Sequence, residues 1–545
     1  MKNMRNKILF TCIACASMAV SCTKKIDEAY QSPNADVKVP VENLLPPIIA
    51  SMAANAAGHG PLNDSRYVSL LTQNFSYYTT GVAGIFEYEQ MGYRPSSDNA
   101  GSLWRMHYYD LGQNLQKMIQ WGVEDKKWDY VGIGYAILAW SWLQLTDYHG
   151  DVILDDAFNT NLLTFKYNTQ PEVYAFARQQ AITALDYLSK TGDGVNATNL
   201  AISDNYLYKG DLNKWKKFAY AVLARSYNHL SNKAEYKPDS VIYYCNKSLA
   251  DNNDNAYVKF ASTGISGNSN FYGPFRGNVG GYRQGAFIAD LMSGAPNTGF
   301  AGVADPRAIY MLRLNPNATF KGGTPNKGLT LLTTNDRPEN FWGGTSATTS
   351  APPNDANCRY IFRNNADVPV ITAAEVQFMK AEAAFKKGDK ATALAAYTLG
   401  ISLNFDMLSG NYATNIPVGK EITPVTKAAY LANPLVVPVA SSGLTITQIM
   451  LQKYIALFGH GVIETWVDMR RYHYNADIDA ATAAPVYKNF TPPSGSDLYV
   501  DNGGKLAYRF RPRFNSEYVW NINELGRIGA DKNDYQTLEC WFSKP

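Results

Sequence analysis

Cysteine is scarce in this sequence, with six residues in a chain of 545. Cys12 and Cys15 fall in an apolar N-terminal stretch, and no Cys-x-x-Cys pair occurs after residue 21. The remaining thiols of Cys245, Cys358 and Cys540 are scattered, and a chain of this length can bury a sizeable core without a disulfide framework. We therefore expect no structural zinc site.

The sequence also lacks a strong excess of basic or acidic residues. The formal charge is +3, and Lys2, Arg5 and Lys7 account for all of it, because the other 47 basic residues equal the 47 acidic ones. Proteins that bind nucleic acid present basic surface to its phosphates. A chain that is neutral beyond its first residues gives no reason to expect a nucleic-acid partner.

Common catalytic motifs are also absent: the sequence has no Gly-x-Ser-x-Gly, P-loop or His-Glu-x-x-His. The best metal-like string, DYHGD at 147–151, follows an apolar helical stretch and contains a glycine, so the end of a helix explains it more simply. His460 and Glu464 have helical spacing, but glycines flank the histidine and no third ligand is evident. We expect no metal, cofactor or catalytic residue. An enzyme stays an alternative, because paired glycosidase carboxylates cannot be identified from one sequence.

The N-terminus has the pattern of an export signal. Basic residues precede Ile8 to Val20, an apolar run of 13 residues that is shorter than the ~20 a membrane-spanning helix needs. Small residues then lead to Cys22, and this stretch resembles the bacterial lipobox, in which the cysteine becomes the first mature residue. We interpret residues 1–21 as a lipoprotein signal peptide; an ordinary signal peptide with an incidental cysteine is the alternative.

Lipidation of Cys22 would explain how such a protein stays at a membrane. The lipobox resemblance implies two acyl chains on the sulfur and commonly one, such as palmitate, on the amine. Each buried methylene contributes ~0.8 kcal/mol, and stable anchoring takes about two chains. We therefore expect a protein that is anchored to a membrane without crossing it.

Aromatic residues, in contrast, are abundant: they make up 13% of the chain, with 37 Tyr and 10 Trp. Tyrosine presents a flat apolar face with a hydroxyl at its edge, which suits sugar rings, peptides and wet protein interfaces. The composition therefore favours a binding protein, although most individual tyrosines are expected to pack between helices.

Helical periodicity recurs along the chain. After a polar tether at 22–47, the pattern predicts one domain over 48–545, with a helical scaffold at about 48–255 and 370–475. Residues 256–369 are rich in Gly, Asn, Pro, Ser and Thr with interspersed aromatics, which is typical of long functional loops. Within the first scaffold segment, helices are predicted at 103–121, 129–145, 171–189, 215–230 and 240–249.

Two further helices are predicted at 372–387 and 391–403, joined by a turn at Gly388-Asp389. Small and large residues alternate on their facing sides as in a tetratricopeptide pair, although no strict period of ~34 is visible. The predicted fold is mainly α: a tetratricopeptide-like scaffold of helical hairpins with long aromatic- and Gly/Asn-rich loop insertions. The facing residues are Ala381, Ala384, Phe385, Ala393, Tyr397 and Ile401.

Several stretches share the pattern of one family. They are LQLTDYHGDVILDDAF (143–158), FKYNTQPEVYAFARQQAITALDYL (165–188), WKKFAYAVLARSYNHLS (215–231), ITAAEVQFMKAEAAFKKGD (371–389), IMLQKYIALFGHGVIETWVDMRRYHY (449–474) and RFNSEYVWN (513–521). Together they resemble the SusD/RagB family, in particular its SusD-like second branch. One departure is Phe514-Asn515, where a Tyr-Pro is common.

The stretch 449–474 is the most specific match. Buried Asp, Trp and Arg side chains of this kind need satisfied partners and fix helix junctions, so we expect its motif residues to be structural. They are Gln452, Lys453, Glu464, Trp466, Asp468, Arg470 and Arg471, in the family's order.

The resemblance implies a helical, tetratricopeptide-containing lipoprotein on the cell outer membrane, facing the exterior. It implies capture of nutrients, usually oligosaccharides and in some members oligopeptides, and their delivery to a TonB-dependent, SusC-like transporter without catalysis. Two other classes stay open: an anchored hydrolase, and a structural lid whose transporter makes the ligand contacts.

A sugar-binding site combines exposed aromatic faces with polar partners on loops that a rigid scaffold holds. Two loop regions fit, residues 77–93 and residues 270–283 with Phe341-Trp342. Trp104 is excluded because it begins a periodic helix and matches a family packing position. The alternative is that the predicted rings fold back onto the scaffold or face the transporter. The predicted ligand contacts are Tyr77, Tyr78, Asn270, Tyr272, Phe275, Arg276 and Trp342.

Overall fold

The computed structural model describes residues 38–93, 100–261, 266–512 and 514–545. Cys22 and the predicted signal peptide lie outside the described residues, so lipidation stays a prediction. The folded body begins at Val41. The side chains of Val41 and Leu45 are buried, so the last residues of the predicted 22–47 tether belong to the folded body.

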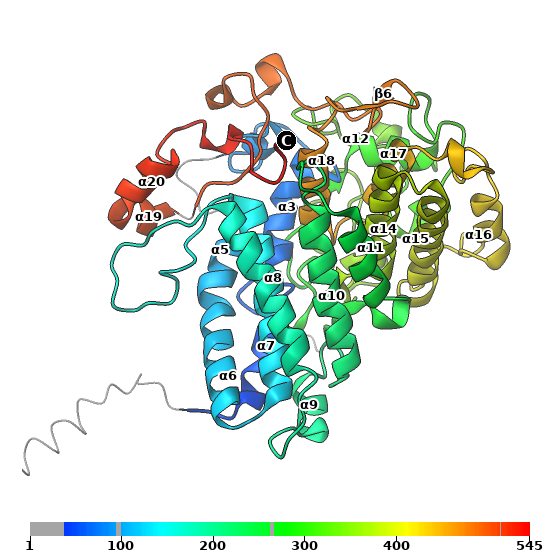
Figure 1. The fold of residues 1–545 in the computed structure, drawn as a ribbon. Helices are drawn as coiled ribbons and strands as arrows, with labels where there is room; N and C mark the ends of the chain where they lie inside the picture. Colours follow the sequence, from blue (N-terminus) through cyan, green and yellow to red (C-terminus); the bar gives the residue numbers. More distant parts are fainter. Residues whose placement is uncertain (1–37, 94–99, 262–265, 513) are drawn as a thin grey trace, which may run out of the picture. The chain divides into compact units, whose positions relative to one another are not determined.

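Long helices pack side by side and form the scaffold (Figure 1). The helices predicted at 129–145, 171–189, 215–230 and 240–249 are confirmed, with ends that differ by a few residues. Each of the scaffold helices contacts the next in this order: α6 (Gly112–Glu124), α7 (Trp128–His149), α8 (Gln170–Tyr187), α10 (Leu212–Asn228), α11 (Pro238–Lys247), α14 (Ala373–Lys387) and α15 (Lys390–Asn411). The stretch predicted as one helix at 103–121 is interrupted by a π-helical turn at Met106–Asp110, between α5 (Ser102–Arg105) and α6.

Helix α7 is buried nearly all round, as its apolar sequence predicts, because α6, α8 and α10 pack against it. It ends at Gly150, whose φ of +83° lies in the left-handed region that glycine adopts without strain. The hydroxyl of Thr146 donates to the Gly150 carbonyl at 2.7 Å. The end of a helix is therefore the correct interpretation of the string at 147–151.

Helices α14 and α15 form the predicted hairpin. The small residues at their contact are buried, and Phe378 packs edge-on against Tyr397 at 6.3 Å between ring centroids. Asp389 caps α15 by accepting a hydrogen bond from the backbone N–H of Thr392 at 3.0 Å. The fold is mainly α and has the tetratricopeptide-like hairpins of the prediction.

Shorter helices flank the scaffold. They are α2 (Leu45–Ser51), α3 (Pro61–Leu71), α4 (Phe86–Glu89), α5 (Ser102–Arg105), α9 (Ala197–Ser203), α12 (Ala286–Ser293), α13 (Ala308–Met311), α16 (Pro424–Leu431), α17 (Ile446–Ala456), α18 (Val462–Arg471), α19 (Phe514–Trp520) and α20 (Ile522–Ile528). Among the described residues, no helix is both long enough and apolar enough to span a membrane.

Strands are short and occur in antiparallel pairs. β1 (Phe75–Tyr77) pairs with β3 (Tyr282–Gln284), β2 (Ala256–Val258) with β4 (Val368–Ile371), and β5 (Ile478–Asp479) with β6 (Ala484–Pro485). The first pair places Tyr77 opposite Tyr282, so it joins the two loop regions predicted to hold the ligand.

The loop-rich stretch has an aromatic core of its own. The rings of Phe341 and Phe362 stack with centroids 4.0 Å apart at 7°. Phe75 of β1 lies against Phe341 at 4.8 Å and against Phe458 at 5.7 Å. Rings from three distant parts of the sequence therefore hold these loops onto the scaffold.

Candidate ligand-binding site

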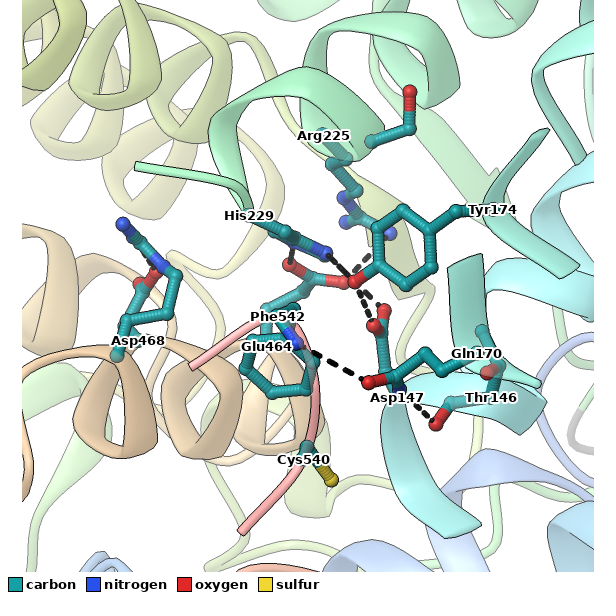
Figure 2. Close-up of polar contacts among 12 residues, drawn as sticks. Thr146, Asp147, Gln170, Tyr174, Arg225, His229, Glu464, Asp468, Cys540 and Phe542 are labelled. Atoms are coloured by element: carbon teal, nitrogen blue, oxygen red, sulfur yellow. Dashed lines mark hydrogen bonds and ion pairs between the residues drawn. The ribbon is translucent and has the colours of Figure 1, made fainter. Parts of the chain in front are cut away.

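Two groups of side chains stand out as candidate sites: a buried polar network between the scaffold helices, and an aromatic cleft beside α5. In the network, His229 lies between Asp147 of α7 and Glu464 of α18 (Figure 2). Its Nδ1 is 3.2 Å from Asp147 Oδ2, and its Nε2 is 2.9 Å from Glu464 Oε2. Tyr174 of α8 donates its hydroxyl to the other oxygen of Asp147. The network therefore links three helices through one imidazole.

The ionisation of the network follows from its geometry. Burial alone would lower the pKa of His229, but the carboxylates of Asp147 and Glu464 outweigh it and raise that pKa to about 9. Despite burial, the pKa of Glu464 lies well below its ordinary value, because Arg225 and His229 stand beside it. Arg225 also binds both oxygens of Glu375 at 2.6 and 2.8 Å. The network therefore contains buried ion pairs at neutral pH.

A second ion cluster continues from the first. Arg471 binds the two oxygens of Glu382 at 2.6 and 2.9 Å and Asp468 at 2.6 Å, and Lys453 lies 2.7 Å from Asp468. All of these groups are buried. The prediction that the motif residues of 449–474 are structural fits this geometry, because each ion has a partner on another part of the fold.

The segment Cys540–Ser543 completes the network from a distant part of the chain. The backbone N–H of Phe542 donates to Gln170 Oε1 at 3.2 Å (Figure 2). Asn232 donates to the Ser543 carbonyl at 2.9 Å. The guanidinium of Arg470 lies over the Phe542 ring at 4.9 Å.

Asp147, His229 and Glu464 bring three potential metal ligands within 4.8 Å of one another. A metal needs a deprotonated ring nitrogen. Both ring nitrogens of His229 instead face carboxylates, which hold the proton on the imidazole at neutral pH. His460, the other histidine of the sequence argument, bonds the hydroxyl of Tyr360 at 2.9 Å rather than pairing with Glu464. The geometry supports a structural ion network at this position.

The second candidate is a cleft of about 260 Å³. It lies where α5 runs into α6 through a π-helical turn at Met106–Asp110, an irregularity that is frequent at functional sites. Phe158 packs against Gly112, where a Cβ would come within 2.7 Å of the ring. The φ of Phe158 is +64°, an uncommon left-handed conformation for an aromatic residue.

Aromatic and amide side chains dominate the lining of the cleft. The ring of Trp104 contacts that of Tyr108 at 4.8 Å, and Tyr108 donates its hydroxyl to the Ile153 carbonyl at 2.7 Å. Exposed Gln113 and Asn159 stand at the rim. The lining residues are Trp104, Tyr108, Gln113, Ile153, Ala157, Phe158, Asn159, Thr160, Leu162, Phe165 and Glu517.

The loop between α7 and α8 forms one wall of the cleft, and α19–α20 hold it in place. The amide of Asn521 exchanges two hydrogen bonds with the backbone of Phe165, at 3.1 and 2.8 Å. The Tyr167 backbone donates to Glu524 at 3.0 Å and accepts from Arg527 at 2.7 Å. The wall is therefore a positioned loop, as a pre-formed binding site requires.

Three of the predicted contact residues are buried. The expectation that their side chains are exposed to a ligand is therefore wrong. Tyr272 and Asn270 are 0% exposed and Trp342 is 2% exposed. The Tyr272 ring stacks on Phe362 at 5.8 Å, and Asn270 donates to the Ala366 carbonyl at 2.9 Å. These side chains fold back onto the scaffold, which was the alternative, because the loop-rich stretch needs a core of its own.

The other four predicted residues, Tyr77, Tyr78, Phe275 and Arg276, are half-buried. The rings of Tyr77 and Tyr78 lie 5.4 Å apart, and Arg276 donates to the Asn55 carbonyl at 3.3 Å. Their role as ligand contacts stays a prediction.

The cleft residues were missed by the sequence reasoning, and Trp104 had been set aside. Trp104 is only 6% exposed, as a packing residue is, yet it also lines the cleft. One available signal was the long loop between α7 and α8, whose sequence contains Phe158, Leu162 and Phe165. Glu517 could not be found this way, because it reaches the cleft from the far end of the sequence.

Comparison with known proteins identifies the family of this chain and solved structures that share its fold. The sequence model of a SusD-like family, described as "Starch-binding associating with outer membrane", matches residues 33–490. No curated protein matches the chain.

Solved structures share the fold over nearly their whole length. A SusD/RagB family protein of Bacteroides thetaiotaomicron is 21% identical with a TM-score of 0.64, covering 93% of this chain and 99% of its own. A SusD homologue of Bacteroides fragilis is 19% identical with a TM-score of 0.67, at 93% and 100% coverage. A chitin-binding SusD homologue of Flavobacterium johnsoniae is 18% identical with a TM-score of 0.63, at 92% and 98% coverage. Since the family model covers most of the sequence and these structures share its fold, the chain belongs to the SusD-like family.

Proposed function

We propose that this protein is a nutrient-binding lipoprotein of the cell outer membrane. It captures oligosaccharides and delivers them to a TonB-dependent, SusC-like transporter. The observation that carries the proposal is the family match over residues 33–490 in a chain that contains a pre-formed aromatic cleft. The chitin-binding and starch-binding descriptions of its relatives support a glycan ligand.

The cleft has the composition of a sugar site. Phe158 and Phe165 are half-buried and offer apolar ring surface, while Gln113 and Asn159 supply amides for hydroxyl groups. A structural lid without ligand contacts has no need of such a cleft, so the binding function is favoured over it. We keep the half-buried surface at Tyr77 and Tyr78 as a second proposed contact area.

We further propose that the protein is not a hydrolase. Glycosidases of the usual type need two carboxyl groups flanking the bond that breaks. Among the described residues that line the cleft, Glu517 is the single carboxylate. Oligopeptides stay the alternative cargo, because aromatic and amide side chains also suit peptides.

We propose that residues 1–21 are removed, that Cys22 carries the lipid, and that the protein faces the cell exterior. The basis is the charged and apolar N-terminal pattern with a cysteine after small residues. The segment from Cys22 to the folded body at Val41 would then serve as the tether.

Titration calorimetry of the detergent-solubilised protein tests the function. The panel holds oligomers of glucose, N-acetylglucosamine and xylose with peptides of matched length, and chromatography after incubation detects cleavage. We expect one glycan class to bind and stay intact. Phe158→Ala with Phe165→Ala should weaken binding about 30-fold, at about 1 kcal/mol for each ring. Tyr243→Ala on α11, where the side chain is 54% exposed, is the control.

Absence of binding across the whole panel would argue against a capture function. Release of shorter products would favour the hydrolase. Binding that the two Phe variants leave unchanged would place the ligand elsewhere, and Tyr77→Ala with Tyr78→Ala would then test the second surface.

A further inference from the structure

The described lining of the aromatic cleft contains one acidic side chain and no basic one. Four rings, Trp104, Tyr108, Phe158 and Phe165, share the lining with one carboxylate, Glu517. Among the described residues, no lysine, arginine or histidine lines the cleft. An anionic ligand, such as a uronic acid or a sulfated sugar, finds no cation there, while a cationic ligand finds both π-faces and a carboxylate.

Glu517 is held in place but keeps capacity for a further hydrogen bond. The Tyr167 hydroxyl and the Asn521 amide both donate to Oε2, at 2.8 and 2.9 Å. Among the described residues, none donates to Oε1. Glu517 is 6% exposed, and burial raises the pKa of its carboxyl above the ordinary value. A buried carboxylate without a cation is costly, and a cation at Oε1 would offset that cost.

We propose that the cleft recognises a protonated primary amine, with Glu517 Oε1 as the acceptor and the rings of Trp104, Tyr108, Phe158 and Phe165 as an aromatic cage. Aromatic faces attract cations within about 6 Å of the ring centroid, and a carboxylate adds a charge-assisted hydrogen bond. The inference rests on the proposed function, because it names the ligand class of the same site.

The size of the cleft limits the ligand to one ring or one side chain. At about 260 Å³ it is smaller than the ~300–1,000 Å³ of sites for drug-sized molecules. Two sources supply an amine of this size: an amino sugar without its acetyl group, and the lysine or N-terminal amine of a peptide. Neutral sugars fit the cleft but leave Glu517 without a cation.

Calorimetry at about pH 7, where the amines of a peptide are largely protonated and that of an amino sugar is protonated in part, tests the amine. Five probes are compared: a glucosamine trimer, its fully N-acetylated counterpart, a glucose trimer, the peptide Gly-Lys-Gly, and the same peptide acetylated at both of its amines. We expect an amine to bind about 10- to 100-fold more tightly than its acetylated form, the range expected for a hydrogen bond to a charged group. The pair of probes that shows the difference identifies the source.

Glu517→Gln keeps the shape and the contacts to Tyr167 and Asn521 but removes the charge. It should abolish the preference for the amine and leave affinity for the acetylated probe unchanged. Glu235→Gln, an exposed carboxylate between α10 and α11, makes the same charge change outside the cleft lining and should have no effect.

Equal affinity of amine and acetylated probes in the native protein would overturn the inference while leaving a glycan-binding function intact. A preference for the amine that survives Glu517→Gln would also overturn it. If no probe and no other glycan or peptide binds, the proposed function itself fails.

Discussion

The indole N–H of Trp342 donates to the backbone carbonyl of Tyr272 at 2.8 Å, and both side chains are buried. The Tyr272 hydroxyl in turn donates to the Leu62 carbonyl of α3 at 3.2 Å. One hydrogen-bonded chain therefore ties two separate loops of the loop-rich stretch to α3, a helix that flanks the scaffold. Rings at these positions contribute to stability through burial.

Trp342→Ala should consequently destabilise the protein by about 3–5 kcal/mol, the usual cost of removing a buried Trp side chain. Trp520→Ala, where the ring is 67% exposed, is the control and should change the free energy of unfolding by less than about 0.5 kcal/mol. Equilibrium urea denaturation measures both. Native-like stability of Trp342→Ala together with lost ligand affinity would show instead that the ring is kept for binding.

The ion pairs of His229 give a prediction about pH. Its pKa is about 9 in the folded protein against an ordinary 6.5, so folding favours the protonated ring. The stabilisation is fully present below pH 6.5 and is lost as the pH rises through 9. His229→Gln should cost about 3–5 kcal/mol at neutral pH, because it leaves two buried carboxylates without their cation.

The difference in unfolding free energy between native protein and His229→Gln should therefore shrink from pH 6.5 to above pH 9. Subtracting the two curves removes other groups that titrate in this range, including His473, because hydrogen bonds with Asp477 and Glu539 raise its pKa to about 10. A difference that stays constant over this range would mean that His229 is neutral in the folded protein.

Cys22→Ala should release the protein from the membrane fraction, because two or more acyl chains are needed for stable anchoring. Cell fractionation with immunoblotting measures this. Cys15→Ala, in the apolar part of the same signal, is the matched control and should remain membrane-bound. If Cys22→Ala also remains in the membrane fraction, another feature anchors the protein.

The proposed transporter complex predicts co-purification. Pull-down of the tagged protein in mild detergent, from cells that express it natively, should recover a large outer-membrane protein whose mass fits a TonB-dependent barrel. Cys22→Ala expressed in the same cells shows how far recovery depends on the anchor. Recovery of the protein alone in both cases would count against the complex.

Most of the scaffold could be predicted because its signals are local. Helix α7 is recognisable from an apolar stretch that ends at Gly150, and the α14–α15 turn from Gly388 and Asp389. Helix α12 (Ala286–Ser293) was missed, since it is short and lies among glycine-rich segments that resemble loops.

The sites could not be predicted in the same way. Loops rich in glycine and asparagine have the same composition whether their rings face inward or outward, so Trp342 looked like a ligand contact although it is buried. Glu517 and Trp104 meet in the cleft from positions more than 400 residues apart. His229 and Glu464 are 235 residues apart, and neither residue type alone indicates its partner. Which of these distant residues come into contact is decided by how the helices pack, and that packing cannot be inferred from local sequence patterns.

The segment Cys540–Ser543 also has a consequence for how the protein reaches its native state. Its contacts to Gln170 and Asn232 mean that the centre of the molecule contains groups whose partners are synthesised more than 300 residues later. Until ribosomes have translated that far, the polar groups around α8 and α10 have no complete set of partners. A copy of the chain that ends before Cys540 would lack the partners of Gln170 and Asn232, so the last residues to be synthesised complete the packing around α8 and α10.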